Sequence, residues 1–144
     1  WKNKTLPNNF KVHYWTQITF DLNGNLHVIG GDYGSKKCHY ICEWNKQKWI
    51  KMNDLSFTIY GAGLCCGPHG LLYLFGGVYN SNISNVMWIY NVNTKEWKQG
   101  TSMPHKRAFF GHINTNNEII VAGGYDGNKT CNDVLIYNFK LQKW

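Results

Sequence analysis

Three short apolar runs, each followed by a pair of glycines, recur at nearly equal intervals along this chain. The runs cover residues 26–29 (interrupted by His27), 72–75 and 120–122, and their glycine pairs begin 46 and 47 residues apart. A run that is apolar at every position, as over residues 71–75, is typical of a strand with both faces buried. We therefore expect each run to be an internal strand of a sheet.

Each glycine pair is followed at a fixed distance by an aromatic residue and then by a tryptophan. Tyr90 and Trp97 follow the second pair by 13 and 20 residues, and Tyr137 and Trp144 follow the third by the same intervals. The first copy is two residues shorter and has Cys42 at the tyrosine position. Such a period indicates an internal repeat. Its signature residues are Gly30, Gly31, Trp49, Gly76, Gly77, Tyr90, Trp97, Gly123, Gly124, Tyr137 and Trp144.

Each repeat contains four expected strands separated by turn residues. In the third repeat we expect strands at residues 107–113, 118–122 and 133–137, with Trp144 beginning the fourth. Asn and Gly, which accept positive φ, fill the turns between them. The expected fold class is therefore all-β. The repeats span residues 11–52, 59–99 and 107–144, and residues 1–4 are expected to be the last strand of a preceding unit.

The paired glycines require a physical reason, because glycine inside a strand weakens it. The usual reason is close approach of another group to the backbone. We expect the neighbours to be the Tyr and Trp of the same repeat, since the three features recur together.

Gly-Gly, then Tyr, six residues, then Trp, with a period just under fifty residues, resembles the kelch repeat. The resemblance covers essentially the whole chain and implies an arc of three four-stranded antiparallel blades from a larger β-propeller. WD40 repeats would need a Trp-Asp dipeptide, which is absent. The chain departs from the kelch pattern at Cys42 and at Ile59, where a kelch repeat often has the Arg that Arg107 supplies in the third copy.

The charge is strongly basic, with a formal net charge of +7 and a pI near 9.2. A basic balance raises nucleic acid or a membrane surface as partners. Fourteen of the 15 basic residues are scattered lysines, however, and Arg107 is the single arginine, whereas readers of phosphate and bases favour arginine forks. We therefore expect no nucleic-acid partner, and no apolar run approaches the roughly 18 residues of a membrane span.

No residue pattern indicates a catalytic, metal-binding or cofactor site. The six histidines form none of the usual zinc-ligand spacings, and the five cysteines contain no Cys-x-x-Cys pair. An odd number of cysteines favours reduced thiols in a cytoplasmic protein. Propeller enzymes of the galactose-oxidase and sialic-acid mutarotase types share similar blades, but their ligand sets match no residues here. We expect no enzyme activity and no cofactor.

The resemblance implies that one rim of the propeller carries two sets of loops. One set follows the glycine pairs, and the other leads into each first strand. Tyr beside Asn, Ser and Gly is typical of adaptable binding surfaces, although a turn with a half-buried Tyr explains it equally well. Arg107 could act as an exposed cation or pair with Asp126. The candidate partner-binding residues are Tyr33, Lys36, Phe57, Tyr79, Asn80, Asn82, His105, Arg107, Tyr125, Asp126 and Asn128.

Residues 103–107 and the Gly-Gly-Tyr-Asp-Gly loop are most similar to BTB-kelch proteins, including poxvirus members. This resemblance implies a protein–protein interaction module. Its function would be to recognise substrates of a ubiquitin ligase, with cullin-3 recruited through a BTB domain outside this chain. Binding to actin is the alternative within the same class of function. Both follow by analogy, because a fold does not fix a function.

Overall fold

The structure is a computed structural model that describes residues 13–31 and 37–144. The strand expected at residues 1–4 and the candidates Tyr33 and Lys36 lie outside these residues. The described chain is all-β, and its helical segments are two three-residue 3-10 turns, η1 (Trp44–Lys46) and η2 (Pro68–Gly70). None of the described helices is long and apolar enough to cross a membrane.

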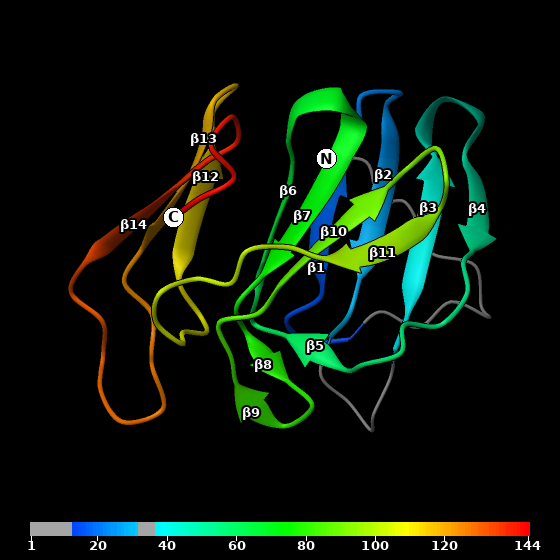
Figure 1. Cartoon of the computed structure of the whole chain (residues 1–144). Helices are drawn as coiled ribbons and strands as arrows, with labels where there is room; N and C mark the ends of the chain where they lie inside the picture. Colours follow the sequence, from blue (N-terminus) through cyan, green and yellow to red (C-terminus); the bar gives the residue numbers. More distant parts are fainter. Residues whose placement is uncertain (1–12, 32–36) are drawn as a thin grey trace, which may run out of the picture.

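Three antiparallel sheets follow one another along the chain (Figure 1). The first has the order β1-β2-β3-β4 and the second the order β11-β10-β7-β6. The third has three strands, β12-β13-β14, and an isolated bridge between Asn138 and Lys143 at the place of a fourth. The strands are β1 (Gln17–Phe20), β2 (Asn25–Ile29), β3 (His39–Glu43), β4 (Lys48–Lys51), β6 (Gly63–Cys66), β7 (Leu71–Phe75), β10 (Met87–Asn91), β11 (Glu96–Gln99), β12 (Gly111–Asn114), β13 (Glu118–Ala122) and β14 (Val134–Asn138).

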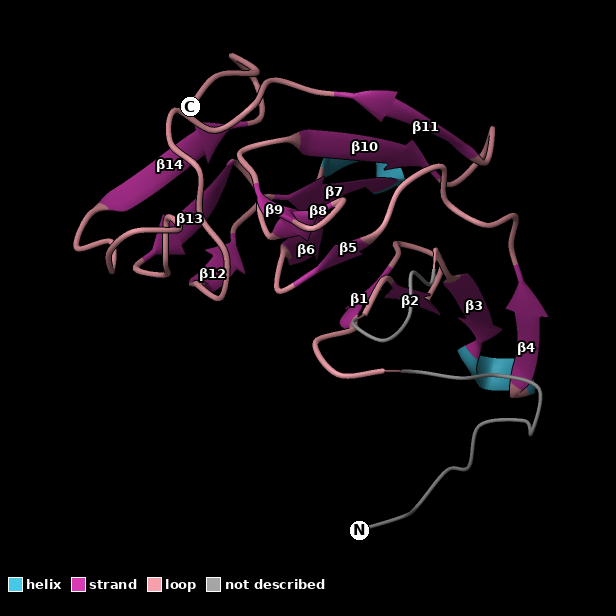
Figure 2. Cartoon of the chain, turned by 90° about the horizontal axis from the view of Figure 1, so that it is seen from below, coloured by secondary structure: helices cyan, strands magenta, loops and turns pink. Residues whose placement is uncertain are grey.

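The sheets are arranged as an arc with their first strands on the inner side. Figure 2 shows β1, β6 and β12 facing the concave side, while β4, β11 and β14 lie toward the outside. β6 contacts both β1 and β12, so the inner strands of neighbouring sheets are adjacent. This is the order in which propeller blades are built.

All three expected first strands, at residues 11–20, 59–66 and 107–113, begin later than predicted, because a residue with positive φ interrupts each. In the first repeat β1 begins at Gln17, after Trp15 at φ +55°. Residues 59–66 divide into β5 (Ile59–Tyr60) and β6, with Gly61 at φ +58° between them. In the third repeat β12 begins at Gly111 rather than at residue 107, after Phe109 at φ +57°. A positive φ is incompatible with a regular strand.

The aromatic signature residues form cross-strand pairs within each sheet. Tyr90 lies opposite Trp97, and Cys42 lies opposite Trp49 in the first sheet, where it takes the place of the tyrosine. The rings of Tyr137 and Trp144 are 5.3 Å apart in the third repeat. Side chains paired across antiparallel strands stabilise a sheet directly, which explains the constant spacing of these residues.

Apolar side chains fill the space between neighbouring sheets. On β7, Leu72 and Leu74 pack toward the first sheet, whereas Tyr73 and Phe75 pack toward the third. Because alternate residues of a strand face opposite sides, a strand covered on both faces must be apolar throughout. The prediction of a doubly buried strand at residues 71–75 is confirmed.

The first two glycine pairs approach the neighbouring blade, and the third meets Ala108, Phe110 and Cys131 of its own repeat, so the prediction that the Tyr and Trp of their own repeat surround the pairs is wrong. The N–H of Gly31 donates to the carbonyl of Ile59 at 2.9 Å, and that of Gly77 donates to the carbonyl of Arg107 at 2.8 Å. A Cβ added at Gly76 would lie 2.8 Å from the same Arg107 carbonyl. The first two doublets therefore form contacts between blades.

Two histidines and an aspartate form a buried polar chain between the first and second sheets. His27 Nε2 lies 3.2 Å from Asp21 Oδ2, and His27 Nδ1 lies 3.0 Å from His39 Nε2. The His39 ring packs edge-on against Tyr90 at 4.8 Å. Burial lowers the pKa of His27. Burial, and to a lesser extent the repulsion that a protonated His27 would exert, lower the pKa of His39 to about 3. Both rings are therefore neutral at pH 7.

We expect Gly77→Ala to destabilise the fold far more than Gly24→Ala. Both residues have positive φ, which costs a non-glycine residue about 1–2 kcal/mol. At Gly24 nothing lies within 4 Å of an added Cβ, whereas at Gly77 the carbonyl oxygen of Tyr60 lies at 2.6 Å. Urea unfolding should show a loss of about 1 kcal/mol at Gly24 and about 3 kcal/mol or more at Gly77. Equal losses would show that close approach is not what requires glycine.

We also expect acid to destabilise the fold through His39. Because burial depresses its folded pKa, the neutral ring supports the fold above its unfolded pKa of about 6.5. This contribution is lost as the pH falls from there toward the folded pKa of about 3. His39→Met, the residue found at the equivalent position Met87, should flatten the fall in unfolding free energy between pH 7 and pH 4. An unchanged slope in His39→Met would contradict this assignment.

Candidate partner-binding rim

The two loop sets predicted for one rim meet along one edge of the molecule, at the bottom of Figure 1. In the second repeat they form a small sheet of their own, in the order β5-β8-β9. β8 (Val78–Tyr79) pairs with β5, which lies in the loop entering the second blade, and β9 (Asn82–Ile83) closes the hairpin. We call this edge, formed by residues 55–60, 78–83, 104–109 and 125–133, the rim.

Asn80 fixes the tip of the β8–β9 hairpin to the neighbouring loop. Asn80 and Ser81 have φ values of +45° and +69°, as a two-residue type I′ turn requires. The Asn80 side-chain oxygen accepts hydrogen bonds from the Thr58 N–H and hydroxyl at 3.0 and 3.3 Å. The Asn82 amide donates to the Asn80 carbonyl at 3.2 Å. These polar contacts hold the tip in one conformation and leave it exposed.

The third repeat has the same arrangement of loops, with fewer backbone pairs between them. Ala108 and Tyr125 exchange two backbone hydrogen bonds of 2.9 Å, so the two loops are joined here as well. Asp126 Oδ1 accepts hydrogen bonds from the N–H groups of Lys129 and Asn128, and these bonds lower the pKa of the Asp126 carboxyl. Asp126 therefore stays ionised and holds its own turn together, rather than pairing with Arg107.

Arg107 lies inside the rim, not on its surface. Its side chain is buried, and one guanidinium nitrogen lies 2.9 Å from both oxygens of Asp133. A second nitrogen donates to the Gly123 carbonyl at 3.0 Å. The hydrogen bond from Arg107 lowers the pKa of Asp133. Arg107 thus links the loop that enters the third blade to the two ends of the loop that follows its glycine pair.

Four candidates from the third repeat line one hollow of about 610 Å³: His105, Arg107, Asp126 and Asn128. His105 and Asn128 are exposed, and Asp126 is half-buried. Three other charged residues line this hollow and were not among the candidates: Lys106 and Lys129, which lie on the loops predicted for the rim, and Asp133, which nothing in the repeat pattern marks.

The remaining candidates divide by exposure. Asn80, Asn82 and Tyr125 are exposed, and Tyr79 is half-buried. Phe57 is buried, with its ring stacked on Trp88 at 4.8 Å. Phe57 and Arg107 are therefore wrong as surface contacts, because both side chains belong to the interior that holds the rim loops.

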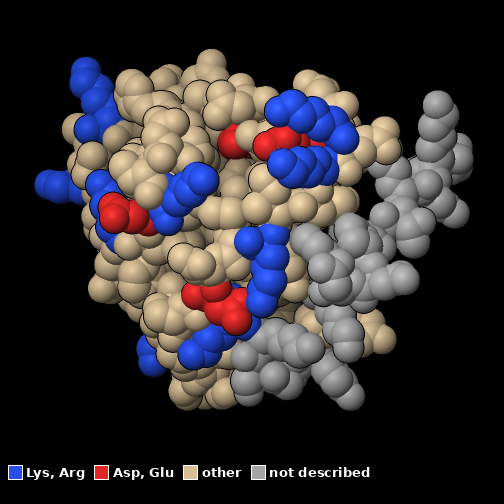
Figure 3. Space-filling view, turned by 90° about the vertical axis from the view of Figure 1, so that its right-hand side faces the viewer, with Lys and Arg blue, Asp and Glu red and all other residues tan. Residues whose placement is uncertain are grey.

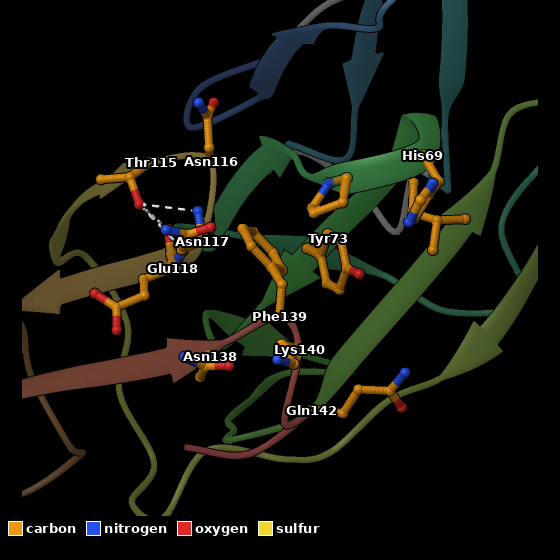
Figure 4. Close-up of a pocket in the computed structure, with 12 residues that line it drawn as sticks. His69, Tyr73, Thr115, Asn116, Asn117, Glu118, Asn138, Phe139, Lys140 and Gln142 are labelled. Carbon is orange, nitrogen blue, oxygen red and sulfur yellow. Dashed lines mark hydrogen bonds between the residues drawn. The ribbon is translucent and has the colours of Figure 1, made fainter.

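A second hollow, of about 790 Å³, lies on the opposite edge, between the turns of the second and third blades. Figure 4 shows Tyr73 and Phe139 between Thr115, Asn116 and Asn117 on one side and Lys140 and Gln142 on another. Its walls are turn residues, and Thr115 accepts hydrogen bonds from the N–H groups of Asn117 and Glu118. The sequence analysis did not single out this edge.

The charged side chains on the face in Figure 3 are mixed in sign. Lys46 pairs with Glu43 and Lys51 with Asp54, each at 3.1 Å. The described side chains on this face therefore form no continuous basic stripe of the kind that nucleic-acid binding surfaces carry.

Comparison with known protein families supports the assignment of these sheets as propeller blades. The kelch motif matches residues 64–104 and 106–144. The chain belongs to the kelch-repeat family. Its fold is an arc of kelch-type β-propeller blades, as the sequence predicted.

Similar proteins extend well beyond this kelch chain. Kelch-like protein 41a of Danio rerio is 31% identical over 101 residues, which is 69% of this chain and 17% of that protein. Kelch-like protein 23 of Homo sapiens is 26% identical over 89% of this chain and 24% of its own length. Kelch domain-containing protein 10 of Homo sapiens is 25% identical over 85% of this chain and 31% of its own length. The repeats and these relatives support a role in protein–protein interaction.

We expect Arg107→Met to loosen the rim of the third blade. The change keeps a long apolar side chain but removes the hydrogen bonds to Gly123 and Asp133. Losing a buried charged group from such a network costs about 2–4 kcal/mol in unfolding free energy. Hydrogen exchange of the amides at residues 123–133 should accelerate, while those of β7 keep their protection. Unchanged exchange in the loop would show that Arg107 does not hold it.

Proposed function

We propose that this kelch chain binds a protein partner through its rim, as the substrate-recognition part of a BTB-kelch adaptor for a cullin-3 ubiquitin ligase in the cytoplasm. The observation that carries the proposal is the pairing of the two loop sets along one edge, through β5 and β8 in the second repeat and Ala108 and Tyr125 in the third.

This pairing supports binding because it fixes the backbone and leaves polar side chains outside. Asn80 and Asp126 each use a side-chain oxygen to hold a loop, so the loops do not have to become ordered when a partner binds. Pre-ordered loops lose less conformational entropy on association. The exposed Asn82, Lys106 and Asn128 then provide donors and charge to a partner.

The cullin-3 step rests on the resemblance to BTB-kelch proteins and on kelch-like relatives of which this chain spans only a part. In such an adaptor the propeller binds the substrate, and a separate domain contacts the ligase. The two contacts should therefore be separable by substitution.

The test compares two triple variants of the full-length protein, expressed in cells with the proteasome inhibited. The rim variant carries Asn82→Ala, Lys106→Ala and Asn128→Ala. The matched control carries Asn116→Ala, Asn117→Ala and Lys140→Ala on the opposite edge (Figure 4). Both remove two amides and one lysine. We expect cullin-3 to co-purify with wild type and with both variants, and a second, ubiquitinated protein to be reduced at least about tenfold in the rim variant alone.

Each other result would count against a defined part of the proposal. If no protein is lost from the rim variant, the rim is not the binding surface. If a partner is lost but cullin-3 is absent from every sample, the ligase role fails and the rim role stands. If that lost partner is actin, the chain is a cytoskeletal module.

A further inference from the structure

Three aromatic rings, one from each blade, meet at the inner margin of the rim. Trp15 precedes β1, Tyr60 lies just before β6, and Phe109 precedes β12. The Trp15 ring stacks on Tyr60, with centroids 5.7 Å apart and planes at 21°. Phe109 meets Trp15 edge-on at 5.4 Å. We call these residues the inner aromatic cluster.

Two members of the cluster occupy a backbone conformation that suits glycine. Trp15, Gly61 and Phe109 lie 46 and 48 residues apart, and their φ values are +55°, +58° and +57°. The second blade thus has glycine where the first and third have large aromatic residues. A left-handed backbone strains a bulky residue, and such strain is concentrated at functional sites.

Gly61 provides the room that the Phe109 ring occupies. A Cβ added at Gly61 would lie 2.5 Å from Phe109 Cε1, and the Phe109 N–H donates to the Gly61 carbonyl at 2.8 Å. The chain therefore brings Phe109 against the second blade at a defined position. That position is on the surface, since Trp15 is 54% exposed and Phe109 47% exposed. Burial in the core does not account for these strained residues.

Two exposed lysines belong to the rim loops of the third blade, on either side of the bridge between Ala108 and Tyr125 in the sequence. Lys106 is three residues before Phe109, and Lys129 lies on the same rim hollow. Both side chains are exposed, and neither ammonium group forms an ion pair with a described carboxylate. Asp126 and Asp133, the acidic residues of the hollow, are occupied by their own turn and by Arg107.

We propose that the inner aromatic cluster is the anchor site of the rim, and that it binds an aromatic or large aliphatic side chain of a peptide segment with acidic residues close by. The inference rests on the proposed function and specifies the partner of that rim. Exposed aromatic rings held in place lose little entropy when they bind an apolar side chain. A cationic partner is disfavoured by the net charge of +7.

The test uses random linear peptides displayed on phage and selected against the purified full-length protein. We expect enriched peptides to share an apolar residue with Asp or Glu close by. Phe109→Gly should weaken their binding at least about tenfold, while relief of the positive φ keeps the Tm within about 5 °C of wild type. The matched control is Phe20→Ala, which removes an equally exposed aromatic residue (47%) from β1 and should leave binding unchanged.

The outcomes separate this inference from the proposed function. If binding is lost in the rim triple variant but survives Phe109→Gly and Trp15→Gly, the rim binds peptides and the anchor assignment is wrong. If neither the rim triple variant nor the two glycine substitutions weaken peptide binding, both proposals fail. Enriched peptides without an apolar residue, or no enrichment above a Trp15→Gly, Phe109→Gly double variant, would also overturn the anchor.

Discussion

The arrangement of this chain depends on one backbone contact between successive blades. The N–H of the second glycine in a doublet donates to the carbonyl of the residue that opens the next blade: Gly31 to Ile59, and Gly77 to Arg107. A side chain at the first glycine would occupy the space of that same carbonyl. The contact therefore sets the spacing of the blades, and the apolar layers on either side of β7 fill the gap that it leaves.

The same contact decides what Arg107 can do. Its carbonyl is fixed by Gly77, and its side chain therefore runs into the third blade, where Gly123 and Asp133 bind the guanidinium. A cation held in this way joins the core to the rim loops and is not available to a partner. The side chains available to a partner are therefore those on the rim loops. Hydrogen bonds to the side chains of Asn80 and Asp126 hold the backbone of these loops in place.

The repeat pattern predicted the sheets well, because each signature residue has a structural role within one repeat. Tyr90 and Trp97 pair across two strands, and the run at residues 71–75 is buried on both faces. The pattern could not show which backbone meets a glycine doublet, since a period relates equivalent residues without showing how repeats touch. Burial of Phe57 and Arg107 escaped prediction for the same reason, as both contacts span different elements.

Positions at which the repeats differ show features of this chain that the shared blade pattern does not determine. The framework accepts His39, Met87 or Val134 at one position and Trp15, Gly61 or Phe109 at another. The first set varies inside or beside the apolar layers, where a polar partner such as His27 must accompany a histidine. In the second set Trp15 and Phe109 are exposed and Gly61 is buried, and glycine alone adopts the shared positive φ without strain. Trp15 and Phe109 combine a positive φ with a ring that is about half exposed, and this combination is the reason for placing the proposed anchor site there.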